Sequence, residues 1–400
     1  MTASRSPSAF ATLMLCFSII GLEGYDIQAF GVAAPRMMAQ LGIGASAQGA
    51  IASAAMVGLI IGAFLSGSLS RHFGLRTMLA GATLLFGLCS IGTAFVPGVG
   101  GLVAVRCLAG VGFGSALPIV LSIASAAGSH RHRSLIVTIA FCGLPAGAAV
   151  VALYARAMGG VVDWHMLFIS GGIVPSLLAP LVFLCIPHSA PPQRAATASA
   201  TSDLFGDNRL LSTLLVWLIF ATTLLATYLM LNWLPSLVVA MGLSAQVGSS
   251  AAFAFNLASI LGAILLSLVV DRLGFRWPLV AAYTLFSLTI VLLAFSHTPD
   301  AVLLFSALAG LLIVGPQCAI YALIPRIYPV HARVLGTSAA VGVGRVGSIV
   351  GPLIAGQLRA GGLPANDVFL SLAPVPLIAA VAVLILGSRA TMTNQPQPAA

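Results

Sequence analysis

Apolar residues fill the chain in long runs of about 20 residues, and short polar or charged segments separate these runs. An α-helix needs about 20 apolar residues to cross the hydrocarbon core of a bilayer, so each run predicts a membrane-spanning helix. Glycine and proline within the runs do not contradict this, because neighbouring helices in a membrane satisfy the freed backbone groups. Twelve spans are predicted, at 11–34, 47–69, 78–96, 100–125, 135–157, 166–187, 209–235, 246–270, 277–296, 301–324, 335–358 and 367–387.

Composition excludes a soluble globular protein. Asp, Glu, Lys and Arg together make up 6% of the residues, whereas about 25% of a soluble domain is charged. Hydrophobic residues make up 60% and are spread along the whole chain, so one buried core cannot account for them. We therefore predict an all-α integral membrane protein whose solvent is the lipid bilayer.

The basic residues predict how the chain is oriented in the membrane. All 17 are arginine, and if the N-terminus is cytoplasmic, twelve fall in cytoplasmic segments, three on the opposite side and two within spans. Because cytoplasmic loops carry an excess of positive charge, this distribution predicts an inner-membrane protein with both termini in the cytoplasm. The net charge of +9 therefore reflects orientation and does not indicate a nucleic-acid partner.

The cysteines, the histidines and the first span indicate no cofactor, metal site or leader peptide. All six cysteines lie within predicted spans without paired spacing, so they predict neither a disulfide framework nor a metal site. His130 and His132 alternate with arginines in a predicted cytoplasmic loop, where we interpret them as solvated charges, and no histidine is predicted in mid-span. The first span lacks a small-residue cleavage site, so we expect it to remain as a helix.

The chain matches itself at a shift of 200 residues. A coincidence in one register across several helices predicts a duplicated six-helix unit. We expect two pseudo-symmetric bundles at 1–187 and 209–400, joined by a cytoplasmic linker at 188–208 that is rich in Ala, Pro, Ser and Thr. Two similar bundles can rock about a central site and open it to alternate sides. The matching pairs include Gly62 with Gly262, Gly110 with Gly310 and Gly147 with Gly347.

Two loops resemble the cytoplasmic signature G-x-L-x-D-R-x-G-R-R of the major facilitator superfamily. Segment 67–76 carries Arg71 where the second copy, 271–276, keeps the acidic residue as Asp271. The resemblance implies the major facilitator fold and an inner gate whose carboxylate pairs with charges and a helix end across the halves. A positive-inside anchor remains the alternative for Arg71, and a solvated loop charge for Asp271. The implied gate residues are Gly67, Arg71, Gly74, Arg76, Asp271, Arg272, Gly274 and Arg276.

The first span narrows the resemblance to one family of transporters. Segment 22–36, with Glu23 and Asp26 flanking Gly24-Tyr25, is similar to the first helix of the aromatic acid:proton symporters, and most similar to their hydroxyphenylpropionate branch. Segment 228–235 resembles the seventh helix of the same family. The resemblance implies uptake of an aromatic carboxylate together with protons. Further partial matches to major facilitator motifs involve Arg106 with Gly110, Gly112 and Gly114, Gly143 with Pro145 and Gly147, and the region 328–352.

The charges within the spans are candidates for the transport chemistry. Glu23 and Asp26 lie three residues apart, so a helix places both carboxylates on one face. Carboxylates in a membrane are costly and two close ones repel each other, so the pair suits proton uptake and release, although a static ion pair with an arginine is the alternative. Arg345 is our candidate for the substrate carboxylate, because guanidinium binds carboxylates bidentately. Arg106 could bind the substrate carboxylate as well, or it could pair with Asp26. For both arginines the alternative is a salt bridge with a purely structural role.

An aromatic ligand also needs flat apolar contacts and a few hydrogen bonds. Trp233, next to Pro235, also fits a belt residue at the membrane interface, and Gln317 also fits helix packing. The candidates for these substrate contacts are Tyr25, Tyr228, Asn232, Trp233, Gln317 and Tyr321.

Proton-coupled uptake of a hydroxyphenylpropionate-type or hydroxybenzoate-type carboxylate, by a monomer that works through alternating access, is the favoured hypothesis. A proton-driven efflux transporter is the alternative, because the same fold supports it. A membrane-embedded enzyme would need a histidine cluster or a nucleophile with a base, and the sequence offers neither at a credible spacing.

Overall fold

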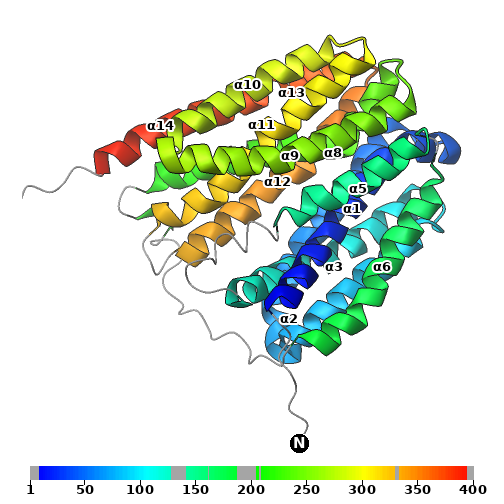
Figure 1. Ribbon diagram of the computed structural model, residues 1–400, viewed down its shortest axis with the longest axis horizontal. Helices are drawn as coiled ribbons and strands as arrows, with labels where there is room; N and C mark the ends of the chain where they lie inside the picture. Colours follow the sequence, from blue (N-terminus) through cyan, green and yellow to red (C-terminus); the bar gives the residue numbers. More distant parts are fainter. Residues whose placement is uncertain are drawn as a thin grey trace, which may run out of the picture.

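The computed structural model describes residues 9–127, 141–160, 162–186, 204–206, 209–328 and 333–393, and every regular element named among them is an α-helix. Figure 1 shows the helices as two bundles, the first coloured from blue to green and the second from green to red. The first bundle contains α1 (Ala9–Leu41), α2 (Ala45–Thr93), α3 (Val99–Ala127), α5 (Gly143–Ala157) and α6 (Trp164–Cys185). The second contains α8 (Leu210–Ala240), α9 (Ala245–Leu273), α10 (Arg276–Ala294), α11 (Pro299–Ile327), α12 (Arg333–Ala360), α13 (Ala365–Leu372) and α14 (Pro374–Thr393).

Two elements differ from the predicted spans in how they are divided. α2 contains two predicted spans, which the structure has at Ala45–Ser66 and His72–Thr93, and the backbone is not helical at Gly74, where φ is 78°. The last predicted span is divided into α13 and α14, since Pro374 has no backbone N–H to continue the helix. The described part of the chain holds eleven spans long and apolar enough to cross a membrane, together with the shorter apolar helix Gly143–Ala157. The prediction of twelve membrane helices is confirmed.

The repeat at 200 residues reappears in the closest contacts between helices. In both halves a glycine of one helix lies directly against a backbone carbonyl of another, at a distance that leaves no room for a side chain. The turns at Gly74 and Gly274 have φ values of 78° and 76°, a region that glycine enters without strain. The two bundles are therefore pseudo-symmetric in packing. The equivalent contacts are Gly62 with Val111 and Gly262 with Leu311, Gly110 with Ala55 and Gly310 with Phe255, and Gly147 with Gly21 and Gly347 with Ala221.

We expect Gly62→Ala to destabilise the protein by about 1–3 kcal/mol, because the added methyl group overlaps the Val111 carbonyl and α2 must move away from α3. Gly81→Ala on the same helix is the matched control, since open space surrounds that position. Alanine is a better helix former there, so stability stays the same or rises by up to about 1 kcal/mol. Thermal unfolding of the purified variants in detergent measures both values. Equal melting temperatures for the two variants would contradict the close packing.

The two bundles are hydrogen-bonded to each other near one end of the molecule. We call this the short-loop end, because short connections lie there, and we call the opposite end the linker end. The described parts of these connections are 42–44, 94–98, 158–160, 162–163, 241–244, 295–298 and 361–364. Side chains near the short-loop end bond across the halves: Gln48 donates to the Ser236 hydroxyl at 3.1 Å, and Ser53 donates to the Ile349 carbonyl at 2.7 Å. Helix pairs α1 with α8, α2 with α12 and α5 with α9 form the interface. The predicted linker 188–208 falls almost entirely outside the described residues, so its boundaries stay a prediction.

Candidate functional site

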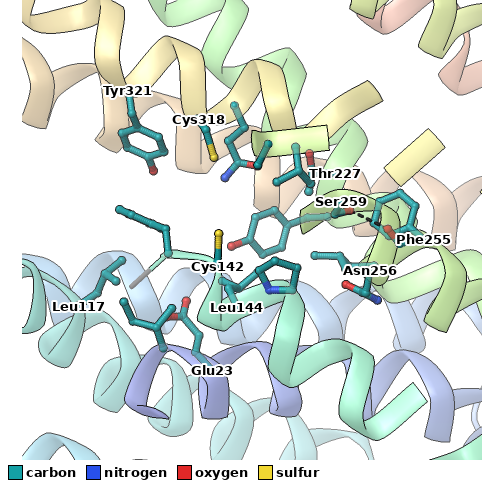
Figure 2. Close-up of a pocket in the computed structure, with 18 of the residues that line it drawn as sticks. Glu23, Leu117, Cys142, Leu144, Thr227, Phe255, Asn256, Ser259, Cys318 and Tyr321 are labelled. Atoms are coloured by element: carbon teal, nitrogen blue, oxygen red, sulfur yellow. Dashed lines mark hydrogen bonds between the residues drawn. The ribbon is translucent and has the colours of Figure 1, made fainter. Parts of the chain in front are cut away.

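A cavity of about 500 Å³ lies between the two bundles. Its walls come from α1, α3 and α5 of the first half and from α8, α9, α11 and α12 of the second half. Most of the lining side chains are apolar or aromatic, with a small number of polar and charged groups among them. Figure 2 shows these side chains converging on the space from both sides. A mostly apolar cavity of this size with a few polar groups has the general form of a small-molecule site.

Two opposite charges face this cavity from different halves. Glu23 of α1 is 3% exposed, and its Oε1 atom has no hydrogen-bond partner among the described residues. Arg345 of α12 donates from one terminal nitrogen to the Tyr228 hydroxyl at 2.7 Å. The positive charge of Arg345 acts electrostatically on Glu23, but the described residues form no direct ion pair between them. The guanidinium thus faces the cavity with a neutral hydroxyl as its hydrogen-bond partner.

Aromatic rings cover the cavity wall near this cation. Tyr228 lies beside Arg345, whose guanidinium carbon is 5.8 Å from the tyrosine ring centroid. Tyr321 of α11 lies between two phenylalanines, with ring centroids 5.5 Å from Phe141 of the first half and 4.8 Å from Phe220 of the second. Of the residues predicted from the sequence, Glu23, Arg345, Tyr228, Gln317 and Tyr321 line this cavity together.

Asp26 and Arg106 form a separate site inside the first half. The two side chains make a buried ion pair, and each is 1% exposed. Ser90 of α2 donates to Asp26 Oδ1 at 3.0 Å, so the pair connects α1, α2 and α3. The guanidinium carbon of Arg106 lies 5.3 Å from the ring centroid of Phe30 and 5.7 Å from that of Phe168. Neither charged residue lines the cavity. Of the two predicted roles for Arg106, the structure shows the ion pair with Asp26. Its side chain does not reach the cavity between the bundles.

Three further candidates lie outside the cavity lining. The Tyr25 hydroxyl is 3.0 Å from that of Ser170, which directs the ring toward α6. Asn232 donates to the Tyr228 carbonyl of its own helix at 2.9 Å. Trp233 is buried and donates to the Pro352 carbonyl at 3.2 Å, so it is a contact between α8 and α12 and not a membrane-interface residue.

The cavity also contains residues that sequence reasoning did not select. Thr227 on α8 and Asn256 and Ser259 on α9 contribute polar atoms, and Cys142 and Cys318 face the space from opposite halves. The sequence could have indicated the polar face of α9, because Asn256 and Ser259 are spaced i,i+3 within a mostly apolar span. No such signal marked Thr227, because threonine is common in membrane helices.

A family model described as the Major Facilitator Superfamily matches residues 16–265 and 241–400. The chain belongs to this superfamily. It is 35% identical over 396 residues to a 3-(3-hydroxyphenyl)propionate transporter of Escherichia coli, and the alignment covers 97% of this chain and 96% of that protein. It is 31% identical over 408 residues to a gallate transporter of Pseudomonas putida, covering 94% and 91%. A 4-hydroxybenzoate transporter of Pseudomonas aeruginosa is 29% identical over 418 residues, covering 96% and 93%.

Solved structures of major facilitator proteins share the fold of this chain. A bacterial homologue of the human lysosomal transporter Spinster, inward-facing and occupied, has a TM-score of 0.76 at 14% identity and covers 99% of this chain and 100% of its own. The xylose transporter XylE of E. coli, in an inward-open conformation, has a TM-score of 0.72 at 16% identity and covers 94% and 95%. The family match and the aligned relatives confirm the resemblance identified from the sequence, and the protein is a multi-pass membrane transporter of this superfamily.

The major facilitator loop residues lie at the linker end. Arg76 is 4.0 Å from the Phe183 ring centroid and Arg276 is 5.1 Å from that of Trp277, so both guanidinium groups lie over aromatic rings of their own half. Asp271 and Arg272 are exposed, and Asp271 forms no ion pair within the described ranges. The surroundings of Gly67, the side chain of Arg71 and residues 128–140, with His130 and His132, lie outside the described part of the chain. Their role as a gate stays a prediction.

Proposed function

We propose that this chain takes up an aromatic or arylalkanoic carboxylate, of the hydroxyphenylpropionate or hydroxybenzoate type, in symport with protons. The observation that carries the proposal is the position of Arg345, a buried cation at the wall of an aromatic-lined cavity between the two halves. The names of the aligned relatives, which are transporters of 3-(3-hydroxyphenyl)propionate, gallate and 4-hydroxybenzoate, support the same ligand class. An anion with a flat apolar body matches a cavity that offers one cation and several rings.

The carboxylate of the substrate would bind at Arg345. A guanidinium presents several N–H groups in a plane, so it can hold both oxygens of a carboxylate while keeping or exchanging its bond to the Tyr228 hydroxyl. The Nε atom of Arg345 is buried without a partner among the described residues, which leaves a further donor for the ligand. The ring of the substrate would then lie along Tyr228 and Tyr321.

Charge balance in the cavity supports coupling to a proton at Glu23. Before a substrate binds, the Glu23 carboxylate and the Arg345 guanidinium would compensate each other's charge across the cavity. A bound anion adds a second negative charge near one cation, which is costly where water is scarce. A proton on Glu23 removes the excess charge. Substrate binding and proton binding are therefore expected to favour each other, which is what symport requires.

Alternating access would use the interface between the halves. Opening toward the short-loop end requires the bonds Gln48 to Ser236, Ser53 to Ile349 and Gln357 to Ser46 to break. These are hydrogen bonds of neutral side chains, each with a modest net contribution. The excess of arginine in the predicted cytoplasmic segments supports a cytoplasmic position for the linker end.

Cells that produce the protein are expected to accumulate labelled 3-(3-hydroxyphenyl)propionate or 4-hydroxybenzoate, and a protonophore should reduce the accumulation at least about tenfold because it removes the driving force. Glu23→Gln should lose the accumulation in the same way but keep exchange of labelled for unlabelled acid, since a permanently neutral residue 23 no longer exchanges protons. Asp300→Asn, an exposed acid at the start of α11, is the control and should accumulate normally.

Protonophore-resistant accumulation would contradict the symport, and failure of every aromatic acid to enter would contradict the ligand class. Everted vesicles distinguish uptake from efflux. An efflux transporter would load such vesicles when their interior is acidified, whereas the proposed symporter would expel the acid from them.

A further inference from the structure

One polar wall of the cavity has no role in binding the carboxylate. It is formed by Thr227 of α8 and by Asn256 and Ser259 of α9, which we call the α8–α9 wall. Figure 2 shows these three side chains together on the side of the cavity opposite Leu117 and Tyr321. Helices α8 and α9 pack against each other, and all three side chains come from the second half of the molecule.

Both hydroxyl groups of the wall direct their hydrogen away from the cavity. Thr227 Oγ1 donates to the Thr223 carbonyl at 2.8 Å, and Ser259 Oγ donates to the Phe255 carbonyl at 2.7 Å. Each hydroxyl has one hydrogen, and a backbone carbonyl one helical turn earlier accepts it. What remains on each oxygen is lone pairs. Toward the cavity, Thr227 and Ser259 can therefore act as acceptors.

The carboxamide of Asn256 also leaves an acceptor free, for an independent reason. Its Nδ2 atom donates to the Ala252 carbonyl at 2.8 Å and to Gln28 Oε1 at 2.7 Å. A carbonyl can only accept, so the nitrogen must occupy this position and the orientation of the amide is determined. Gln28 in turn donates to the Leu231 carbonyl at 3.4 Å, which keeps its own oxygen directed at Asn256. Both N–H groups of Asn256 are used, and Oδ1 is left as an acceptor.

The cavity thus has two polar regions of opposite kind. The guanidinium of Arg345 supplies N–H donors at one region, and acceptors make up the α8–α9 wall. We propose that the α8–α9 wall binds a hydroxyl group on the ring of the substrate and makes the transporter selective for hydroxylated aromatic acids. The hydroxyl donates its hydrogen to Thr227, Asn256 or Ser259, while the carboxylate is held at Arg345. A methoxy group, whose oxygen can only accept, finds no donor on this wall and loses solvation there.

This proposal rests on the proposed function, and ligand competition on the wild-type protein tests the two separately. The probes are 3-phenylpropionate, its three ring-hydroxylated isomers and the corresponding methoxy compounds. We expect the best hydroxylated isomer to bind about tenfold more tightly than 3-phenylpropionate, and its methoxy counterpart to bind more weakly than both. If 3-phenylpropionate binds saturably and no hydroxylated isomer binds more tightly, the wall proposal is overturned while the proposed function stands. If no acid binds, both are overturned.

Substitutions in the α8–α9 wall then test whether it causes the preference for hydroxylated acids. Thr227→Val, Ser259→Ala and Asn256→Leu each remove one acceptor, and the quantity compared is the ratio of the affinities for the hydroxylated acid and for 3-phenylpropionate, in which any general loss of binding cancels. We expect the ratio to fall to below about threefold in at least one variant and in the triple variant. A ratio that keeps its wild-type value in all of them overturns the assignment.

Matched controls exist on the same two helices. Thr222 of α8 and Ser249 of α9 make the same kind of bond to a carbonyl one turn earlier, and neither lines the cavity. Thr222→Val and Ser249→Ala remove equivalent hydroxyl groups from equivalent helical positions. Both are expected to keep the wild-type ratio, so that a change at the wall reflects its position at the cavity. The same loss of ratio in the controls overturns the assignment.

Discussion

Replacing Arg345 with glutamine is expected to abolish saturable uptake of the aromatic acid while the protein still folds and reaches the membrane. Removing one partner of a buried, hydrogen-bonded charge pair costs about 2–5 kcal/mol, which corresponds to a loss of affinity of roughly 30-fold to several thousand-fold. Arg345→Lys keeps the charge but loses the planar set of donors, so an intermediate affinity is expected. Purified variants titrated with 3-(3-hydroxyphenyl)propionate give the affinities directly.

Arg359→Gln is the matched control for this substitution. Arg359 lies on the same helix, and its guanidinium donates to the Leu363 carbonyl at 2.6 Å near the short-loop end, outside the cavity. Wild-type affinity is expected for this variant. The amide of the same acid provides a second control, because it has the size of the substrate without the negative charge and should not bind wild-type protein. Wild-type affinity in Arg345→Gln would contradict the assignment of the carboxylate position.

The helices and their duplication could be predicted from the sequence because both depend on local patterns. A membrane span needs an apolar run of a given length whatever surrounds it. The 200-residue register could be found because glycines at helix crossings, such as Gly62 and Gly262, have no acceptable substitute against a neighbouring backbone. The break between the second and third spans could be predicted for the same reason, because the backbone leaves the helical conformation at Gly74.

Some of the predicted site residues line the cavity and others lie outside it, and this division has a physical cause. Glu23 and Arg345 were selected because charges are rare and costly within a membrane, a criterion that does not require knowing which way a side chain points. Tyr25, Asn232 and Trp233 were selected by residue type on helices whose orientation was unknown. α8 is buried on most of its surface, so its apolar pattern does not reveal which face borders the cavity.

The polarity of the α8–α9 wall could not be predicted from the sequence at all. Serine, threonine and asparagine can each donate and accept, and which of the two they offer a ligand depends on where their hydrogens are directed. That depends on neighbours such as Gln28, which is 228 residues from Asn256 along the chain. Residue identity thus predicts a polar group, and only the packing of the two halves determines its direction.

Replacing Asp26 with asparagine is expected to destabilise the protein by about 3–5 kcal/mol, because breaking a buried ion pair leaves the charge of Arg106 without compensation. The guanidinium is enclosed by the rings of Phe30 and Phe168, and no other carboxylate of the described residues lies within ion-pair distance. Asp163→Asn is the control. The exposed Asp163 caps α6 by accepting from the His165 backbone, a role that asparagine also fills, so a change within about 0.5 kcal/mol is expected. Thermal unfolding in detergent measures both.

The double variant Asp26→Asn with Arg106→Gln separates folding from proton coupling. Removing both charges removes the uncompensated cation, so most of the lost stability is expected to return. Proton-driven accumulation should nevertheless remain absent, because the proposed coupling uses both carboxylates of α1, Glu23 at the cavity and Asp26 in its pair with Arg106. Exchange of labelled for unlabelled acid should persist, because the cavity is unchanged. A double variant that folds and accumulates like the wild type would make the pair purely structural and leave Glu23 as the sole proposed proton carrier.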